Sequence, residues 1–221
     1  MSDDFHKRLQ GALLRIRGDH PFFGTLALFA EFKVSEEVST AATDGAVLWF
    51  NPAFVEKQDM SQLCGLVTHE LLHAALQHVF RRKERTPKLW NIAADIVVNG
   101  MIRKDTAYQL PDGGVENAEL AHLSVEEIYE QLNTGKVELP DLLLLDLMLA
   151  GGDRDGQDGS IADEQAESMQ RHWRAALQQA GAVARRINRG FGNNGLDALR
   201  DLQGASTPTL SWREILWQFM V

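Results

Sequence analysis

Hydrophobic residues recur every three or four positions along most of the chain, which is the spacing of an amphipathic helix. This pattern predicts helices over residues 4–17, 61–80, 87–103, 124–132 and 162–189. Local signals mark several of their starts: Ser61 is a candidate N-cap, Thr86-Pro87 provides an N-cap and a first-turn proline, and Ser124 begins a capping box. Most of the chain is therefore predicted to be helical.

Two short apolar stretches follow a different pattern and predict strands. Residues 25–34 are apolar and partly alternating, while residues 46–51 follow the turn sequence Thr43-Asp44-Gly45 and stop at Pro52. Residues 35–45 are expected to be a turn-rich connection between them. The predicted fold class is α+β, mostly α, with a small β-sheet before the helix at 61–80, and we expect residues 1–221 to form one domain with a Gly/Asp-rich loop at 151–160.

Composition and charge exclude several classes of protein. With 22 basic and 31 acidic residues the net charge is −9, which argues against a nucleic-acid binder with a basic footprint and against a polybasic membrane anchor. The N-terminus does not resemble a signal peptide, and no apolar run approaches the roughly 18 residues of a membrane span. The single cysteine, Cys64, fits a reducing compartment. We expect a cytoplasmic protein that binds neither nucleic acid nor membrane.

The segment Thr68-His69-Glu70-Leu71-Leu72-His73 carries the clearest chemical signal. Its HExxH pattern places His69 and His73 about 40° apart around a helix, so both imidazoles can reach one metal ion. Glu70 lies about 100° from His69, where it can contact a water molecule on the metal without binding the metal. Two histidines, a third protein ligand and an open water position are typical of zinc sites that catalyse hydrolysis. The sequence predicts Zn²⁺ as cofactor and Glu70 as general base. The corresponding fold is a zincin-like helical domain.

Two residues compete for the third ligand position. His78 lies nine residues after His69 and points about 180° away if the helix continues, and no glycine between them turns the chain back. A histidine in such a position is more often a surface residue or one that supports a ligand than a ligand itself. Asp95 is the better candidate, because it lies with Asn91 and Asn99 on a polar stripe of an otherwise apolar helix that would fold back against the HExxH helix. Asp95 could instead orient one of the histidines as a hydrogen-bond acceptor.

Three motifs in this order resemble a known family. TDGAVLWFNPAFV, VTHELLHAALQHVFRR and LWNIAADIVVNGMI are similar to predicted metal-dependent peptidases that have an N-terminal metallopeptidase domain and a C-terminal von Willebrand factor A-like domain. The resemblance implies His69 and His73 as metal ligands, Glu70 as catalytic base and Asp95 as third ligand. The A-like domain is not in this sequence, and the helix predicted over 211–220 runs to the last residue without a cap, so we expect a truncated chain.

These patterns support two function hypotheses. In the first, the protein is a zinc-dependent peptidase acting on a peptide or protein, and the strand at 47–50 (VLWF) is an edge strand that pairs with the substrate. In the second, it is a non-catalytic, metal-stabilised module that works with the A-like domain and a MoxR-type AAA+ ATPase, a partner that the resemblance suggests. The presence of Glu70, which a purely structural site does not need, favours the enzyme. Tyr108 and His122 are candidates for stabilising an oxyanion, although no spacing places them near the metal.

Overall fold

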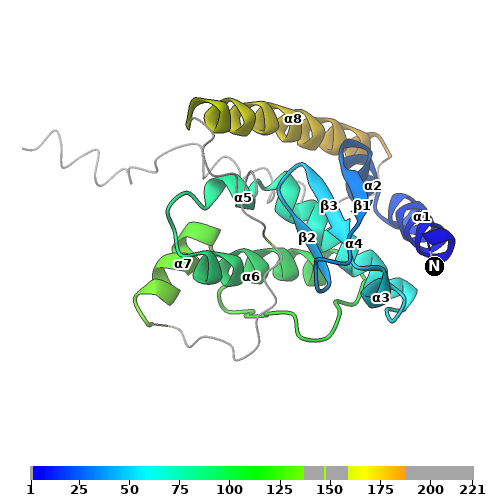
Figure 1. Ribbon diagram of the computed structural model, residues 1–221, viewed down its shortest axis with the longest axis horizontal. Coiled ribbons are helices and arrows are strands. Elements are labelled where there is room, and N and C mark those ends of the chain that lie inside the picture. Colours follow the sequence, from blue (N-terminus) through cyan, green and yellow to red (C-terminus); the bar gives the residue numbers. More distant parts are fainter. Residues whose placement is uncertain (1, 137–146, 148–158, 188–221) are drawn as a thin grey trace, which may run out of the picture.

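The computed structural model describes residues 2–136, 147 and 159–187, and these residues form a mostly helical α+β fold (Figure 1). The helices are α1 (Ser2–Asp19), α2 (Pro21–Leu26), α3 (Pro52–Val55), α4 (Met60–Ala75), α5 (His78–Arg81), α6 (Pro87–Asp105), α7 (Val125–Asn133) and α8 (Gly159–Arg186), with a 3-10 turn, η1, at Ala27–Phe29. The strands are β1 (Glu31–Val34), β2 (Ala41–Thr43) and β3 (Val47–Phe50). The predicted fold class is confirmed.

Helix α4, which contains the HExxH motif, lies at the centre of the molecule. Every residue from Leu63 to Ala75 is buried, because α1, α6, α8 and the sheet all pack against this helix. Figure 1 shows α8 along one side of the molecule and α6 with α7 along the other. The motif is thus held by contacts with helices and with the sheet.

The small sheet has the strand order β1-β3-β2, with β1 parallel and β2 antiparallel to β3. The prediction of an edge strand at 47–50 was therefore wrong, since β3 is the central strand. The reason is that residues 35–45, expected to be only a connection, contain the short strand β2, whose Ala41 pairs with Phe50. The strand predicted at 25–34 was also too long, because the helix that begins at Pro21 continues to Leu26 and only Glu31–Val34 is extended.

The N-terminus of α4 differs from the prediction, whereas that of α7 matches it. The N-cap of α4 is Asp59 rather than Ser61, and Asp59 forms a capping box with Gln62. The Ser61 hydroxyl instead accepts a hydrogen bond from the backbone N–H of Gln109 at 3.1 Å. The capping box predicted at Ser124 is present at the start of α7. Ser61 thus helps to attach the segment after α6 to α4.

The prediction of one continuous helix over 61–80 was wrong. Helix α4 ends at Ala75, and Gln77 adopts a left-handed conformation with φ of 60°. The chain therefore turns at Gln77 and begins α5 at His78. This turn moves His78 to a position that a continuous helix would not allow.

Two buried clusters of apolar residues meet along α6. One includes residues of α1, α2, α4, the sheet, α8 and the C-terminal half of α6, and the other combines the N-terminal half of α6 with α7. Within the described parts of the chain, no helix is long and apolar enough to cross a membrane. The predicted loop at 151–160 lies outside the described residues except for its last two positions, which begin α8, and the predicted helix at 211–220 lies outside them entirely.

Candidate metal centre

Three side chains from α4 and α6 converge on one point. His69 and His73 project from α4 and Asp95 from α6, and all three are buried. The Nε2 atoms of the two histidines are 2.9 Å apart. Asp95 Oδ1 lies 3.3 Å from His73 Nε2 and 3.9 Å from His69 Nε2. The structure therefore brings together the two histidines and the carboxylate that the sequence singled out.

The spacing of these three atoms fits a metal ion. Nitrogen and oxygen ligands lie about 2.0–2.2 Å from a tetrahedral zinc ion, which places any two of them about 3.3–3.6 Å apart. The three observed separations of 2.9, 3.3 and 3.9 Å bracket this range. Two imidazoles and one carboxylate are also a donor set that zinc accepts. Geometry and chemistry thus both suit a small divalent cation.

Asn99 determines which nitrogen of His69 faces this point. The Asn99 amide donates from Nδ2 to the Val115 carbonyl at 2.7 Å, and a carbonyl can only accept, so the orientation of the amide is fixed. Asn99 Oδ1 then lies 2.7 Å from His69 Nδ1, which must carry the proton. In a neutral imidazole the other nitrogen keeps its lone pair. His69 Nε2 therefore presents a lone pair to Asp95 and His73.

Asn91 orients Asp95 in the same manner. Its Oδ1 accepts a hydrogen bond from the backbone N–H of Leu147 at 3.1 Å, so its Nδ2 is left to donate to Asp95 Oδ2 at 3.2 Å. This contact holds one carboxylate oxygen and turns the other, Oδ1, toward the histidines. Both asparagines of the polar stripe on α6 thus orient a residue of the cluster, Asn99 acting on His69 and Asn91 on Asp95.

His78 lies directly behind His73. The two Nδ1 atoms are 3.0 Å apart, and the rings meet edge to face. Burial lowers the pKa of His78 well below its usual value, and the neighbouring His73 and Arg81 lower this pKa further. His78 is consequently a neutral imidazole. It is not a member of the His69–His73–Asp95 cluster.

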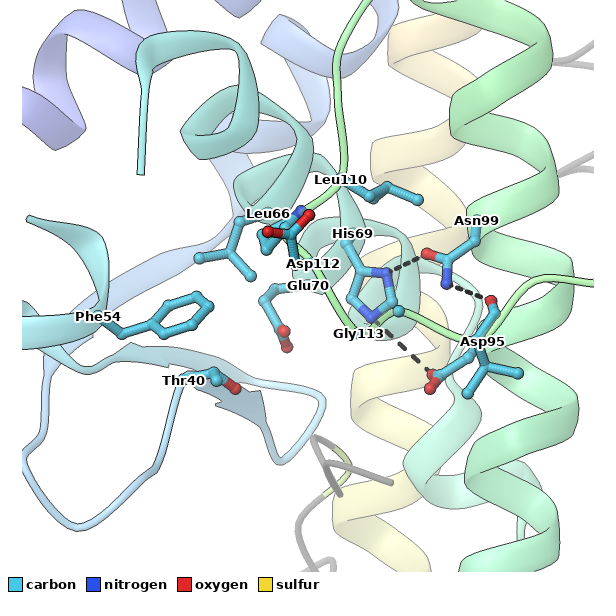
Figure 2. Close-up of a pocket in the computed structure, with 13 residues that line it drawn as sticks. Thr40, Phe54, Leu66, His69, Glu70, Asp95, Asn99, Leu110, Asp112 and Gly113 are labelled. Atoms are coloured by element: carbon cyan, nitrogen blue, oxygen red, sulfur yellow. Dashed lines mark hydrogen bonds and ion pairs between the residues drawn. The ribbon is translucent and has the colours of Figure 1, made fainter. Parts of the chain in front are cut away.

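A cleft with an empty volume of about 560 Å³ opens over the cluster. His69, Glu70, Asp95 and Asn99 lie in its lining, together with residues from two walls: Thr40, Phe54 and Leu66, and the segment 110–115. Figure 2 shows the Glu70 carboxylate extending into the cleft between Phe54 and His69. Glu70 is thus placed to meet a molecule that enters the cleft and approaches the cluster.

The second wall of the cleft, the segment 110–115, is attached closely to α4. At Gly65 a Cβ atom would lie only 2.1 Å from the carbonyl oxygen of Gln109, so only glycine permits this approach of backbone to helix. The left-handed conformation of Gly113, with φ of 92°, turns the segment over the cleft. The wall is therefore part of the packed structure of the protein.

The sequence predictions for this region have mixed outcomes. His69, Glu70 and Asp95 line one cleft, and His73 lies buried behind them, in contact with His69 and Asp95. Tyr108 and His122 do not line the cleft. The Tyr108 hydroxyl instead donates to Asp19 at 3.2 Å, and His122 is exposed. The wall at 110–115 is not predicted from the sequence, although Pro111-Asp112-Gly113-Gly114 is a strong turn signal between two helices.

Comparisons with known proteins agree with this description. A protein of Thermotoga maritima, described only as uncharacterized, is 29% identical over a region that covers 59% of this chain and 40% of the relative. The chain thus spans less than half the length of this relative. No solved structure matches the chain significantly. A family model described as "Putative metallopeptidase domain" matches residues 4–221. Because the match extends over nearly the whole sequence, the chain belongs to this family of metallopeptidase-like domains.

Proposed function

We propose that this domain is a zinc-dependent peptidase in which His69, His73 and Asp95 hold the metal and Glu70 is the general base. The observation that carries the proposal is the convergence of His69 Nε2, His73 Nε2 and Asp95 Oδ1 at the base of a cleft that Glu70 also lines. When bound, zinc lowers the pKa of a water molecule and polarises the carbonyl group of a substrate. The remaining steps belong to side chains of the domain.

The position of Glu70 supports its role as the base. It follows His69 directly on α4, so it reaches into the cleft from the same helix turn without entering the ligand cluster. From there its carboxylate accepts the proton of the attacking water and delivers this proton to the leaving amine. The apolar side chains of the walls, among them Phe54 and Leu66, exclude water and pack against an extended peptide.

Metal analysis of the purified protein is the first test. We expect about one zinc ion per chain in the wild type and none in His73→Ala. The same donor set of two histidines and one carboxylate also holds iron in oxygenases. Iron in place of zinc, or no metal after zinc is supplied, would therefore contradict the proposal.

The second test isolates Glu70. Glu70→Gln keeps the size of the side chain but cannot accept the proton, so the metal-loaded variant should lose about 10²–10⁴-fold in kcat on a peptide mixture while zinc content stays at the wild-type level. The exposed Glu84 provides the matched control, since Glu84→Gln should change neither value. Equal turnover by wild type and Glu70→Gln would refute the role of Glu70. Zinc binding without hydrolysis in the wild type would favour the alternative, a metal-stabilised interaction module.

A further inference from the structure

His73 has a hydrogen-bonding requirement on the side that faces away from the cleft. A neutral imidazole carries one proton, so His73 can offer a lone pair at Nε2 only if this proton is on Nδ1. Nδ1 then needs an acceptor, because the ring is completely buried and water does not reach it. His78 Nδ1, at 3.0 Å, is in the position of that acceptor.

Helix α5, which carries His78, is held by contacts with α4, α6 and α7. The His78 backbone carbonyl accepts a hydrogen bond from Trp90 Nε1 of α6 at 2.7 Å. In the same short helix, α5, the Arg81 guanidinium donates to the Leu76 carbonyl at the end of α4 and pairs with Glu126 of α7 at 2.8 Å. His78 is therefore buried in a short helix that is attached to α4, α6 and α7.

On the side of His78 that faces away from His73, no contact within the described part of the chain determines the tautomer of the imidazole. His78 Nε2 is buried and has no hydrogen-bond partner among the residues that the structure describes. Nothing described on that side decides which nitrogen of His78 carries the proton, so this choice follows from its contact with His73. A proton on His78 Nε2 leaves Nδ1 free to accept.

We propose that His78 is a positioning residue of the metal site, which accepts a hydrogen bond from His73 Nδ1–H and thereby directs the His73 Nε2 lone pair toward the metal. The inference rests on the proposed metal site and adds a residue to it. The opposite proton arrangement, with His78 Nδ1–H donating, would place a proton on His73 Nε2 and direct it at Asp95 Oδ1, which lies 3.3 Å away. A protonated nitrogen cannot bind zinc, so only one of the two arrangements is compatible with a loaded site.

Nitrogen-15 NMR of the zinc-loaded wild-type protein tests the arrangement directly. Long-range correlations between ring protons and ring nitrogens distinguish protonated from unprotonated nitrogens, and the spectrum of His78→Asn assigns the His78 signals. We expect His73 to be protonated at Nδ1, and His78 to be protonated at Nε2 and unprotonated at Nδ1. A proton on His78 Nδ1 would overturn the proposal.

Zinc affinity, measured by competition with a chelator, gives the second test. In His78→Asn the amide oxygen replaces Nδ1 at the same number of bonds from the backbone, so this variant should keep most of the wild-type affinity. His78→Leu has no acceptor and should lose about 10–100-fold. Equal affinity in the two variants would show that His78 only fills space. The exposed His122 supplies a control, because His122→Asn should bind zinc as the wild type does.

These measurements separate this inference from the proposed function. A protein that binds zinc with the expected tautomers but hydrolyses no peptide would leave the role of His78 intact and contradict the peptidase. A wild-type protein that binds no zinc would overturn both. If His78→Leu does not fold, the NMR measurement on the wild type still decides.

Discussion

Asn99 shows how a single side chain can determine the chemical state of another. Its two hydrogen bonds, to the Val115 carbonyl and to His69 Nδ1, leave His69 only one tautomer. Asn99→Ala removes both contacts, so His69 is free to rotate and to protonate at Nε2. We expect zinc affinity to fall about 10–100-fold, as is typical when the partner of a metal-binding histidine is removed. Chelator competition measures this loss, and Asn133→Ala, at an exposed site on α7, should show none.

Burial raises the pKa of the Cys64 thiol and so reduces its reactivity. The thiol is completely buried in α4, 3.7 Å from the Ala12 carbonyl, and burial raises its pKa to about 11. At pH 8 only about one thiol in a thousand is ionised, and the thiolate is the reactive form.

A colorimetric thiol reagent should therefore leave the native protein unlabelled at pH 8 and label one thiol per chain in denaturant. Raising the pH should accelerate the labelling only as it approaches the raised pKa or unfolds the protein. Rapid labelling under native conditions would show that α4 opens far more often than its packing implies.

At the scale of elements, the packing of α4 against the segment after α6 depends on one glycine. A Cβ atom at position 65 would meet the Gln109 carbonyl oxygen at 2.1 Å, and backbone atoms cannot rotate away as a side chain can. Gly65→Ala should therefore lower the free energy of unfolding by about 1–3 kcal/mol, as is usual for overpacking. Denaturant titration measures the change.

Gly18→Ala is the matched control for this prediction. Gly18 lies near the end of α1, and nothing would come within 4 Å of an added Cβ. Alanine favours the helix over glycine, so the free energy of unfolding should stay equal to or rise above that of the wild type by up to about 1 kcal/mol. If Gly65→Ala lowers the free energy of unfolding no more than Gly18→Ala does, the close contact between α4 and Gln109 is contradicted.

The elements that the sequence predicts well are those with local signals. The helices that begin at Pro87 and after Ser124 have a first-turn proline and a capping box, and both starts lie where predicted. The turn at Gln77 has no such signal, because a residue with a side chain adopts a conformation that usually indicates glycine. The direction predicted for His78 holds only for a continuous helix and was therefore wrong, because the helix ends at Ala75.

The residues of the site likewise divide into those with a local sequence signal and those without one. The HExxH spacing and the polar stripe on α6 are periodic along single helices, so a single sequence contains them. The strand β2 is too short to show a pattern, and its pairing with β3 depends on contacts between separate segments. The wall at 110–115 likewise takes its position from α4 through Gly65 and Ser61. Both β2 and this wall depend on contacts between separate segments, and neither was predicted from the sequence.

For the molecule as a whole, the cluster of His69, His73 and Asp95 lies where the two apolar cores meet. On α6, Val97 packs into the core shared with α7, and the next residue, Val98, into the core around α4. Asp95 thus extends from α6, which contributes to both cores, toward α4, which contributes to one. A metal ion held by α4 and α6 would connect the two cores directly.

The charge of the molecule leads to a prediction about its substrates, which rests on the proposed function. The chain has a net charge of −9. None of the described residues that line the cleft is a lysine or arginine, and Asp112 lies at its exposed rim. A bound zinc ion would offset the charges of Glu70 and Asp95, so Asp112 is the carboxylate that remains to attract a cation. A cationic peptide should therefore be attracted both over a distance and at the rim. We expect kcat/KM to be about tenfold higher for a peptide with a lysine beside the cleaved bond than for its glutamate counterpart, and to fall with added salt.

Asp112→Lys should reduce or reverse this preference, since it replaces the rim carboxylate by an ammonium group. Glu84→Lys changes the net charge by the same amount at an exposed position outside the cleft lining. If attraction by the rim dominates, only the first variant alters the ratio of kcat/KM between the two peptides, whereas attraction by the whole molecule alters it equally in both. If neither variant nor salt changes the selectivity, the charge of the cleft does not determine which peptide binds. The apolar side chains of the two walls, Phe54, Leu66 and Leu110, would then determine it.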